Sequence, residues 1–198
     1  MKKRIAAALA LVILAALASA APVEATVSYS VDPVHSEVSF RIRHFVSRVR
    51  GQFRDFSGTI VKDDENPAAT KVEFVIQATS IDTDHDRRDN HLRSADFFDV
   101  EKFPTITFTS TAVERVAESE YRVTGHLTMH GITKALTLPV RFEGELPDGQ
   151  GGFRAAFSTE QRLDRKEFGI VWNRVLDQGG RMLGDDVEIE ISLAAIRR

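Results

Sequence analysis

The feature that most constrains this 198-residue chain is a repeated strict alternation of apolar and polar residues. Around Val38, Phe40 and Ile42, every second side chain is apolar and the residues between them are charged or polar. A period of two places the apolar side chains on one face of a β-strand. The same pattern recurs at 51–62, 72–78, 106–108, 121–129, 136–142, 153–157 and 187–193. The chain is therefore predicted to be all-β.

Turn-forming residues separate several of these segments. They include the Pro67 turn, the His130-Gly131 pair and the Gly-rich stretch 147–152, and Gly58 predicts a bulge or kink within its own strand. Some eight one-faced strands have fewer exposed edges when the sheet closes on itself. An antiparallel barrel or a sandwich fits this pattern, and an eight-stranded antiparallel β-barrel is favoured. Eight strands enclose an interior that is filled by side chains or holds one slender ligand.

One long polar connection interrupts the strand pattern between Ser80 and Phe108. It lacks Gly and ends in a cluster of Phe residues. Thr83 or Asp84 is placed to cap a short helix, with Asp86 in the first turn. Long connections in compact domains are typically functional lids or plugs. We therefore expect a short helical insert that covers part of the barrel.

The N-terminus has the pattern of a signal peptide. Lys2, Lys3 and Arg4 precede an apolar run at 5–17, and a small-x-small site ends at Ala20. The run is shorter than the roughly 20 residues of a membrane-spanning helix, and no Cys is available for lipid attachment or disulfides. We expect residues 1–20 to be cleaved and residues 21–198 to form a single domain in the periplasm, with no transmembrane segment after cleavage.

The charge balance argues against a polyanionic partner. The chain has 26 Lys and Arg against 29 Asp and Glu, and loss of the three N-terminal cations would leave 23 against 29, a net charge of −6. A net negative protein has no overall attraction for a polyanion. We expect no nucleic-acid partner and no anionic membrane surface held by charge.

The residues give no signature of an enzyme or of a metal site. A Gly-x-Ser-x-Gly nucleophile elbow is missing from the sequence. His126 and His130 have a spacing that suits zinc on a helix, but on a strand they would lie about 13 Å apart; His85 or His91 of the insert could join one of them only in principle. Asp82 begins a calcium-loop pattern that then places Arg where Gly and Glu are required. We expect no metal, no cofactor and no catalysis.

A set of charged residues near the insert and the C-terminus allows two interpretations. Arg88, Asp89, Asp99, Arg165 and Asp185 could form buried ion pairs that pin the insert to the barrel, or a catalytic set. Structural pairing is the favoured interpretation.

The aromatic residues leave a further question open. Thirteen Phe stand against two Tyr and one Trp, and many fall on the predicted apolar faces. Such residues would suit an ordinary packed core or a dry cavity for an apolar ligand. The residues alone do not decide between these alternatives.

Several motifs together resemble one family. They are Tyr29-x-Val31-Asp32-x-x-His35-Ser36-x-Val38-x-Phe40, Gly51-x-Phe53-x-x-Phe56-x-Gly58, the whole 80–108 stretch, Gly125-x-Leu127-Thr128-Met129-His130-Gly131-x-Thr133-Lys134, Arg165-x-x-Phe168-Gly169 and Gly184-Asp185-Asp186-Val187-x-Ile189. In this order they are similar to the YceI-like family of exported proteins described as polyisoprenoid-binding.

The resemblance implies a lipocalin-like barrel around an elongated apolar cavity that holds a polyprenyl lipid or an isoprenoid quinone, often in a homodimer. The residues expected to line the cavity are Phe40, Ile42, Phe53, Ile60, Phe74, Ile76, Phe97, Phe98, Phe108, Leu127, Phe142, Phe157 and Phe168. The polar residues carried over are Asp32, His35, Arg88, Asp89, His130, Lys134 and Arg165, expected to close the barrel by hydrogen bonds, with one or two meeting a head group.

The function expected from these observations is a periplasmic carrier of an isoprenoid lipid. Two alternatives remain: an interaction module of the stress response, with a filled interior, and an enzyme that acts on an amphiphilic lipid.

Overall fold

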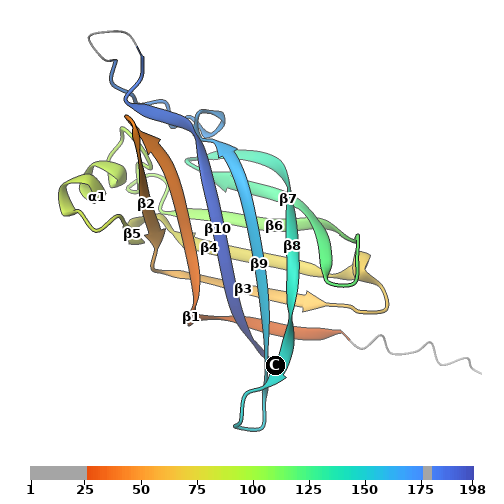
Figure 1. Ribbon diagram of the computed structural model, residues 1–198. Helices are drawn as coiled ribbons and strands as arrows, with labels where there is room; N and C mark the ends of the chain where they lie inside the picture. The colour runs from red at the N-terminus through yellow and green to blue at the C-terminus, as the bar shows by residue number, and fades with distance from the viewer. Residues whose placement is uncertain (1–25, 176–179) are drawn as a thin grey trace, which may run out of the picture.

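The strands of the chain form a closed antiparallel barrel with a small accessory layer at one end (Figure 1). The computed structural model describes residues 26–175 and 180–198, so the expected signal peptide lies outside the described residues. The strands are β1 (Val27–His44), β2 (Ser47–Phe53), β3 (Phe56–Lys62), β4 (Lys71–Gln77), β5 (Ile81–Asp82), β6 (Thr105–Arg115), β7 (Glu120–Met129), β8 (Ile132–Pro147), β9 (Phe153–Asp164) and β10 (Leu183–Arg197).

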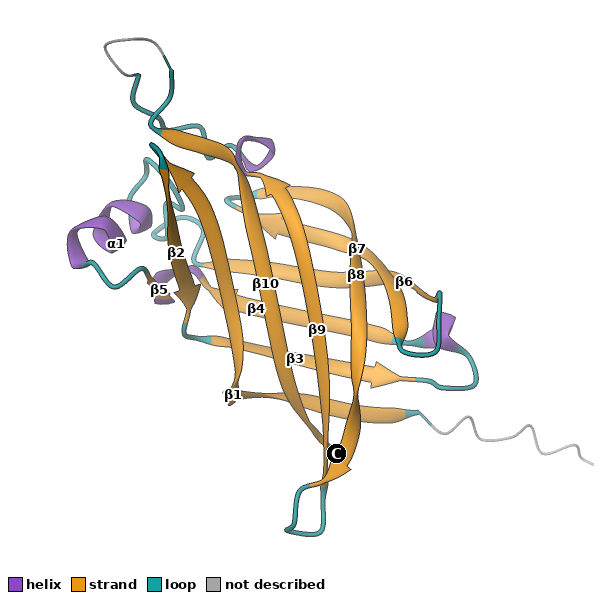
Figure 2. Cartoon of the chain, viewed as in Figure 1, coloured by secondary structure: helices purple, strands orange, loops and turns teal. Residues whose placement is uncertain are grey.

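Eight of these strands close the barrel, in the order β1, β3, β4, β6, β7, β8, β9 and β10, with β10 pairing back onto β1. The prediction of an eight-stranded antiparallel barrel is confirmed. β2 and β5 lie outside this ring: β2 pairs with the second half of β1, and β5 pairs with the end of β2. The remaining elements are the helix α1 (Asp86–Arg93) and three single 3-10 turns, η1 (Pro67–Ala69), η2 (Ala78–Ser80) and η3 (Arg165–Phe168); Figure 2 shows how few helical residues there are.

β1 is long and bent because it crosses from one pairing partner to another. Its register with β10 shifts between Asp32 and Glu37, where Pro33 cannot donate to the ladder. Ser36 repairs the gap: its hydroxyl donates to the Asp32 carbonyl at 2.6 Å and accepts from the Ala194 N–H at 2.9 Å. The Ser36 side chain therefore provides hydrogen bonds for the Asp32 carbonyl and the Ala194 N–H at the bend.

Two local predictions need correction. The segment 51–62 is not one strand, because the ladder stops at Arg54 and Asp55 between β2 and β3. Gly58 does not make a bulge: its pairing with Phe74 is regular, and a Cβ there would lie 2.5 Å from the Phe74 ring. Glycine is needed at this position because a ring occupies the space of a side chain.

The β7–β8 connection is the His130-Gly131 turn that the sequence predicts. His130 and Gly131 form a two-residue turn with φ of 52° and 75°. Positive φ at both positions matches the twist of a tight antiparallel hairpin.

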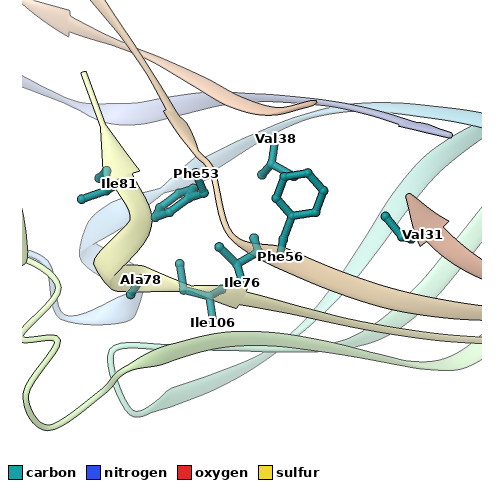
Figure 3. Packing of buried hydrophobic residues seen from close by; sticks show 8 residues of the cluster. All are labelled: Val31, Val38, Phe53, Phe56, Ile76, Ala78, Ile81 and Ile106. Atoms are coloured by element: carbon teal, nitrogen blue, oxygen red, sulfur yellow. The ribbon is translucent and has the colours of Figure 1, made fainter. Parts of the chain in front are cut away.

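A buried apolar cluster joins the accessory layer to the barrel wall. Figure 3 shows Phe53 of β2 and Ile81 of β5 against Ile76 and Ile106, which belong to β4 and β6. Ile81 is completely buried. Burial of such side chains stabilises by about 1.5–3 kcal/mol each, so the short strand β5 is fixed by packing more than by its two paired residues.

Among the described residues, every helix is too short or too polar to cross a membrane.

Candidate ligand-binding cavity

Two cavities lie in line along the barrel axis. The larger has a volume of about 280 Å³ and lies at the end that carries α1; the smaller, of about 120 Å³, lies toward the opposite end. Five residues border both of them: Phe74, Phe108, Leu138, Thr159 and Ile191. We call these five the waist. The interior thus holds two apolar cavities that meet at these five side chains.

Three glycines keep aromatic rings against the wall of the channel. Added Cβ atoms at Gly51, Gly58 and Gly125 would lie 2.4, 2.5 and 2.6 Å from atoms of the Phe40, Phe74 and Phe108 rings, respectively. Each of these rings therefore occupies the space above a glycine instead of projecting to the axis. A glycine beneath each ring lets the ring lie flat on the wall, which leaves the interior open. Glycine within strands commonly serves such close approaches.

The insert covers the large cavity. Thr83, Arg88, His91, Leu92, Phe97 and Phe98 all border it. Phe97 is buried against Ile170 and Leu183, and its ring lies 5.1 Å from the Trp172 ring. The position of the insert over the large cavity agrees with the expectation that it covers part of the barrel.

Buried hydrogen bonds shape the insert. Asp89, which is 5% exposed, accepts from the Thr83 N–H at 3.0 Å and from the Thr83 hydroxyl. Arg88 donates to the Thr83 hydroxyl and carbonyl at 2.6 and 2.7 Å. Because Thr83 is used in this way, the helix cap is His85, whose Nδ1 accepts from the Arg88 N–H at 3.3 Å. The predicted caps Thr83 and Asp84 were wrong.

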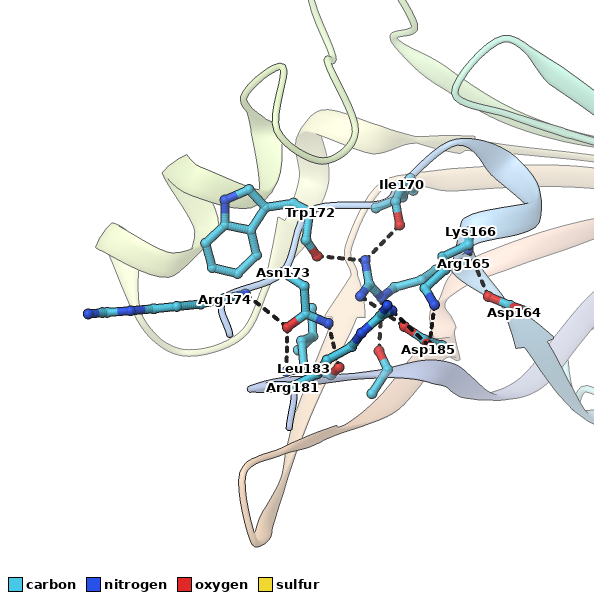
Figure 4. A network of polar contacts seen from close by, with 11 residues as sticks. Asp164, Arg165, Lys166, Ile170, Trp172, Asn173, Arg174, Arg181, Leu183 and Asp185 are labelled. Atoms are coloured by element: carbon cyan, nitrogen blue, oxygen red, sulfur yellow. Dashed lines mark hydrogen bonds and ion pairs between the residues drawn. The ribbon is translucent and has the colours of Figure 1, made fainter. Parts of the chain in front are cut away.

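A second covering segment follows β9, and Arg165 organises it (Figure 4). This guanidinium is 3% exposed. It donates to the carbonyls of Gly184, Ile170 and Trp172 at 2.9, 2.6 and 2.9 Å, and to Asp185 at 3.3 Å. Burial lowers the pKa of Arg165, while the Asp185 and Asp164 carboxylates oppose that effect.

Of the five residues expected to form ion pairs that pin the insert, only Arg165 and Asp185 pair with each other. This pair fixes the segment after β9 and not the insert. Asp99 is paired with Lys102 at 2.9 Å, and Arg88 and Asp89 both bond to Thr83. The hydrogen bonds to Thr83, with those that Arg93 donates to the carbonyls of Thr79 and Ile81, fix the shape of the insert. The pairing of β5 with β2 and an ion pair between Arg54 and Asp82 join the insert to the rest of the chain.

The opposite end of the barrel is closed by side chains. Tyr29 packs edge-on against Phe157 with ring centroids 5.9 Å apart, and Phe142 packs on Phe157 at 5.4 Å. Lys62 lies over the Phe142 ring at 4.6 Å. Burial, with Glu145 beside the hydroxyl, raises the pKa of Tyr29 to about 12. Rings and an alkyl chain thus fill the space below the small cavity.

Eleven of the thirteen residues expected to line the cavity border one of the two cavities. Phe142 and Phe168 do not. Phe142 belongs to the packed end, and Phe168 is buried in η3, where its carbonyl accepts from His130 Nδ1 at 3.0 Å. Whether the eleven contact a ligand stays a prediction.

The seven predicted polar residues are scattered. Arg88 and Arg165 border the large cavity, and Asp89 supports the insert. Asp32 and His35 lie at the bend of β1, where Arg154 and His35, bonded to the carboxylate, lower the pKa of Asp32 to about 2. His130 braces η3, and Lys134 is exposed on β8. Of the seven, only Arg88 and Arg165 are placed to meet a ligand.

Sequence reasoning missed several cavity residues. Leu138, Ile189 and Ile191 lie on faces that the alternation did indicate. Trp172 and Met182 come from irregular segments, which carry no periodic signal. Thr159 was also missed: its hydroxyl is buried at the waist without a hydrogen-bond partner among the described residues.

Comparisons with known proteins agree with this architecture. Residues 29–195 match the family model described as the YceI-like domain. "Protein YceI" of Escherichia coli O6:H1 is 47% identical over 137 residues, which cover 69% of this chain and 71% of that protein. "Protein YceI" of Salmonella arizonae is 42% identical over 165 residues, 83% of each chain.

Two solved structures share the fold. Burkholderia cenocepacia BcnA superposes with a TM-score of 0.72 at 25% identity, covering 83% of this chain and 98% of that one. A polyisoprenoid-binding domain from Saccharophagus degradans has a TM-score of 0.66 at 15% identity, covering 86% and 98%, a likeness of fold alone.

Proposed function

Since the chain belongs to the YceI-like family, we propose that it is a binding protein that carries a long-chain isoprenoid lipid through the periplasm. The ligand would be a polyprenyl lipid or an isoprenoid quinone. Its tail would occupy the large cavity and pass the waist into the small one.

The observation that carries this proposal is the shape and chemistry of the channel. Two apolar cavities in line, joined at the waist, fit a chain that is long, slender and apolar. Removing roughly 400 Å² of such a tail from water would contribute about 10 kcal/mol before the costs of ordering and immobilisation. Affinity would then depend on apolar contact more than on polar recognition.

The polar groups near the channel favour binding over catalysis. Thr83, Asp89 and Arg165 are occupied by the hydrogen bonds that hold the two covering segments. An interaction module with a filled interior is less well supported, because open volume remains inside the barrel. A neighbour that shares the fold is named as a polyisoprenoid-binding domain, which supports the proposed ligand class.

Export is the second part of the proposal. Residues 1–20 have the charge, apolar run and small-residue site of a signal peptide. An isoprenoid tail is insoluble in the aqueous periplasm, so a shielded carrier would serve its transfer.

The test is native mass spectrometry of the protein collected from the periplasm of an expressing bacterium, with organic extraction of bound lipid. We expect an isoprenoid at close to one per chain. Leu138→Trp, which places an indole at the waist, should reduce the bound fraction at least about fivefold by blocking the passage between cavities.

The matched control is Leu146→Trp, on the same strand but exposed, which should keep the ligand. Protein that stays free of lipid after incubation with quinones and polyprenyl phosphates would contradict the proposal. A chemically altered lipid would instead favour an enzyme.

A further inference from the structure

The rim of the large cavity carries exposed apolar side chains. Val46, at the turn between β1 and β2, is fully exposed, and Phe45 beside it is 42% exposed. Val171 and Val175, in the segment after η3, are 63% and 74% exposed. The Phe45 N–H donates to the Met182 carbonyl at 2.7 Å, which joins the turn to the start of β10, as Figure 1 shows at the upper end of the barrel.

These side chains are direct neighbours of residues that line the cavity. His44 borders the large cavity and precedes Phe45, while Val171 precedes Trp172, another lining residue. Isolated exposed apolar residues are ordinary on a protein surface. The tip formed by Phe45 and Val46 is a different case, because it lies at the mouth of an apolar cavity. The tip and the cavity mouth would meet the same apolar surface.

Below the tip, the outer face of the β1–β2 hairpin is a stripe of arginines. Arg43 lies directly across from Arg48, and Arg41 across from Arg50. Like charges in directly opposed positions destabilise a sheet unless carboxylates offset them. Three of the four arginines form ion pairs with carboxylates: Arg41 with Glu190, Arg48 with Glu188 and Arg50 with Glu37.

Arg43, nearest the tip, differs from the other three. Its guanidinium donates to the Phe45 carbonyl at 3.2 Å, and in residues 26–175 and 180–198 it has no carboxylate within ion-pair distance. The net negative charge of the chain led us to expect no anionic membrane contact, but net charge does not describe this local arrangement.

We propose that this end of the barrel docks on an anionic phospholipid bilayer, with Phe45 and Val46 inserted and Arg43, which has no carboxylate partner among the described residues, at the phosphates. The dimensions agree: Arg43 and Arg48 are two residues from the tip, about 7 Å along the strand. Interfacial protein segments bury their apolar residues about 5–10 Å below the headgroups.

A second copy of the chain fits this surface less well. Two tips meeting face to face would bring Arg43 and Arg48 of one copy against the same residues of the other. An anionic bilayer supplies the opposite charge. Docking would place the cavity mouth at the headgroup level; its use in lipid transfer depends on the proposed function, but docking itself does not.

The experiment measures binding of the secreted protein to vesicles of phosphatidylethanolamine with phosphatidylglycerol, and to vesicles of phosphatidylcholine alone. We expect binding to the anionic vesicles that weakens with added salt. Trp172, the single Trp of the chain, borders the mouth and should be quenched by brominated lipid.

Phe45→Asn with Val46→Ser should weaken vesicle binding at least about tenfold, because it removes the inserted apolar surface. Asn is chosen because Phe45 has a φ of 53°, which Asn adopts readily. Arg43→Gln should cost about fivefold on anionic vesicles alone, the effect of one cation near such a surface. The matched control, Leu146→Ser with Phe153→Asn, removes exposed apolar residues at the opposite end and should bind like the unchanged protein.

Three results would overturn the proposal. One is a lack of binding to anionic vesicles at low salt; another is equal weakening by the control pair. The third is unchanged vesicle binding by the Phe45 and Val46 variant together with loss of a dimer in light scattering, which would identify a second copy as the occupant. Lipid content by mass spectrometry is a separate readout, so failure of docking and failure of isoprenoid binding can be told apart.

Discussion

The two ends of the barrel are closed by different means. At the end with Tyr29 and Phe142, aromatic rings pack on one another and on the strands. At the other end, two excursions from the barrel, residues 78–104 and the described parts 165–175 and 180–182 of the segment after β9, lie over the cavity. Their charged side chains, Asp89 and Arg165 above all, fix them by hydrogen bonds.

This difference between the two closures indicates which end of the barrel can open to admit a ligand. Apolar packing involves many weak contacts within the strands themselves, so opening that end would disturb the ladder. The covering segments pack on the barrel through Ile81, Phe97 and Ile170 as well as through these bonds. Among the described residues, however, β5 is the only strand that they add to the sheet, so they can move while the barrel ladder stays intact. We therefore expect a ligand to enter at the end that carries α1.

The largest effect should follow from Arg165→Ala. The change leaves the buried carbonyls of Gly184, Ile170 and Trp172 without their donor. We expect the free energy of unfolding to fall by about 3–5 kcal/mol, measured by urea denaturation.

Arg162→Ala is the matched control. Arg162 lies on β9 just before η3, with 63% of its side chain exposed and an ion pair to Glu188 at 3.1 Å. Exposed pairs of this kind contribute at most about 1 kcal/mol. Equal losses for the two variants would show that the segment after η3 is not held by Arg165.

The barrel was predictable because its strands obey one local rule. Alternation at Val38, Phe40 and Ile42 places their side chains on one face whatever the partner strand. The existence of the strands therefore followed from the pattern, whereas closure into a barrel was only favoured over a sandwich. The break at Arg54 and the pairing of β5 were not predictable, since both depend on the cluster around Ile81 and Phe53. Tertiary packing decided these boundaries.

The cavity was predictable only in part. The apolar faces indicated most of its lining, but whether a face is filled or open depends on how rings lie across strands. Gly125 and Gly58 keep the Phe108 and Phe74 rings at the wall, and sequence reasoning interpreted Gly58 as a bulge. Arg165 was chosen correctly as a structural residue, yet its carbonyl partners come from an irregular segment that carries no sequence signal.

A smaller effect, confined to the covered end, is expected for Asp89→Ala. The Thr83 N–H and hydroxyl would lose their acceptor inside the protein, which should cost about 2–3 kcal/mol. Hydrogen exchange should rise in residues 82–104 and stay unchanged in β8, β9 and β10, because only the insert depends on this carboxylate.

Asp86→Ala is the control for that experiment, because Asp86 is exposed on the same helix. It should change stability by about 0.5 kcal/mol or less, the size of a charge effect at a helix start. Faster exchange throughout the barrel in the Asp89 variant would contradict the separation between cover and ladder.

The smallest effect is expected at the bend of β1, on the side of the barrel away from the cover. Arg154 and His35 lower the pKa of Asp32 from 3.8 to about 2, so the folded state favours the charged carboxylate. Its contribution is fully present above pH 4 and is lost as the pH falls toward 2. We expect about 1–2 kcal/mol, reduced by the partial exposure of Arg154.

Asp32→Asn should lower the free energy of unfolding at pH 7 by this amount and flatten its dependence on pH between 4 and 2.5. Arg154→Gln should lower the free energy of unfolding by most of this amount. His35→Gln should lower it less, because 64% of the His35 side chain is exposed. Bound lipid should be retained in all three variants, since the bend borders neither cavity. An Asp32→Asn protein that kept the acid sensitivity of the unchanged chain would show that another group causes it. Loss of bound lipid in that variant would place Asp32 in the binding site instead of in the wall.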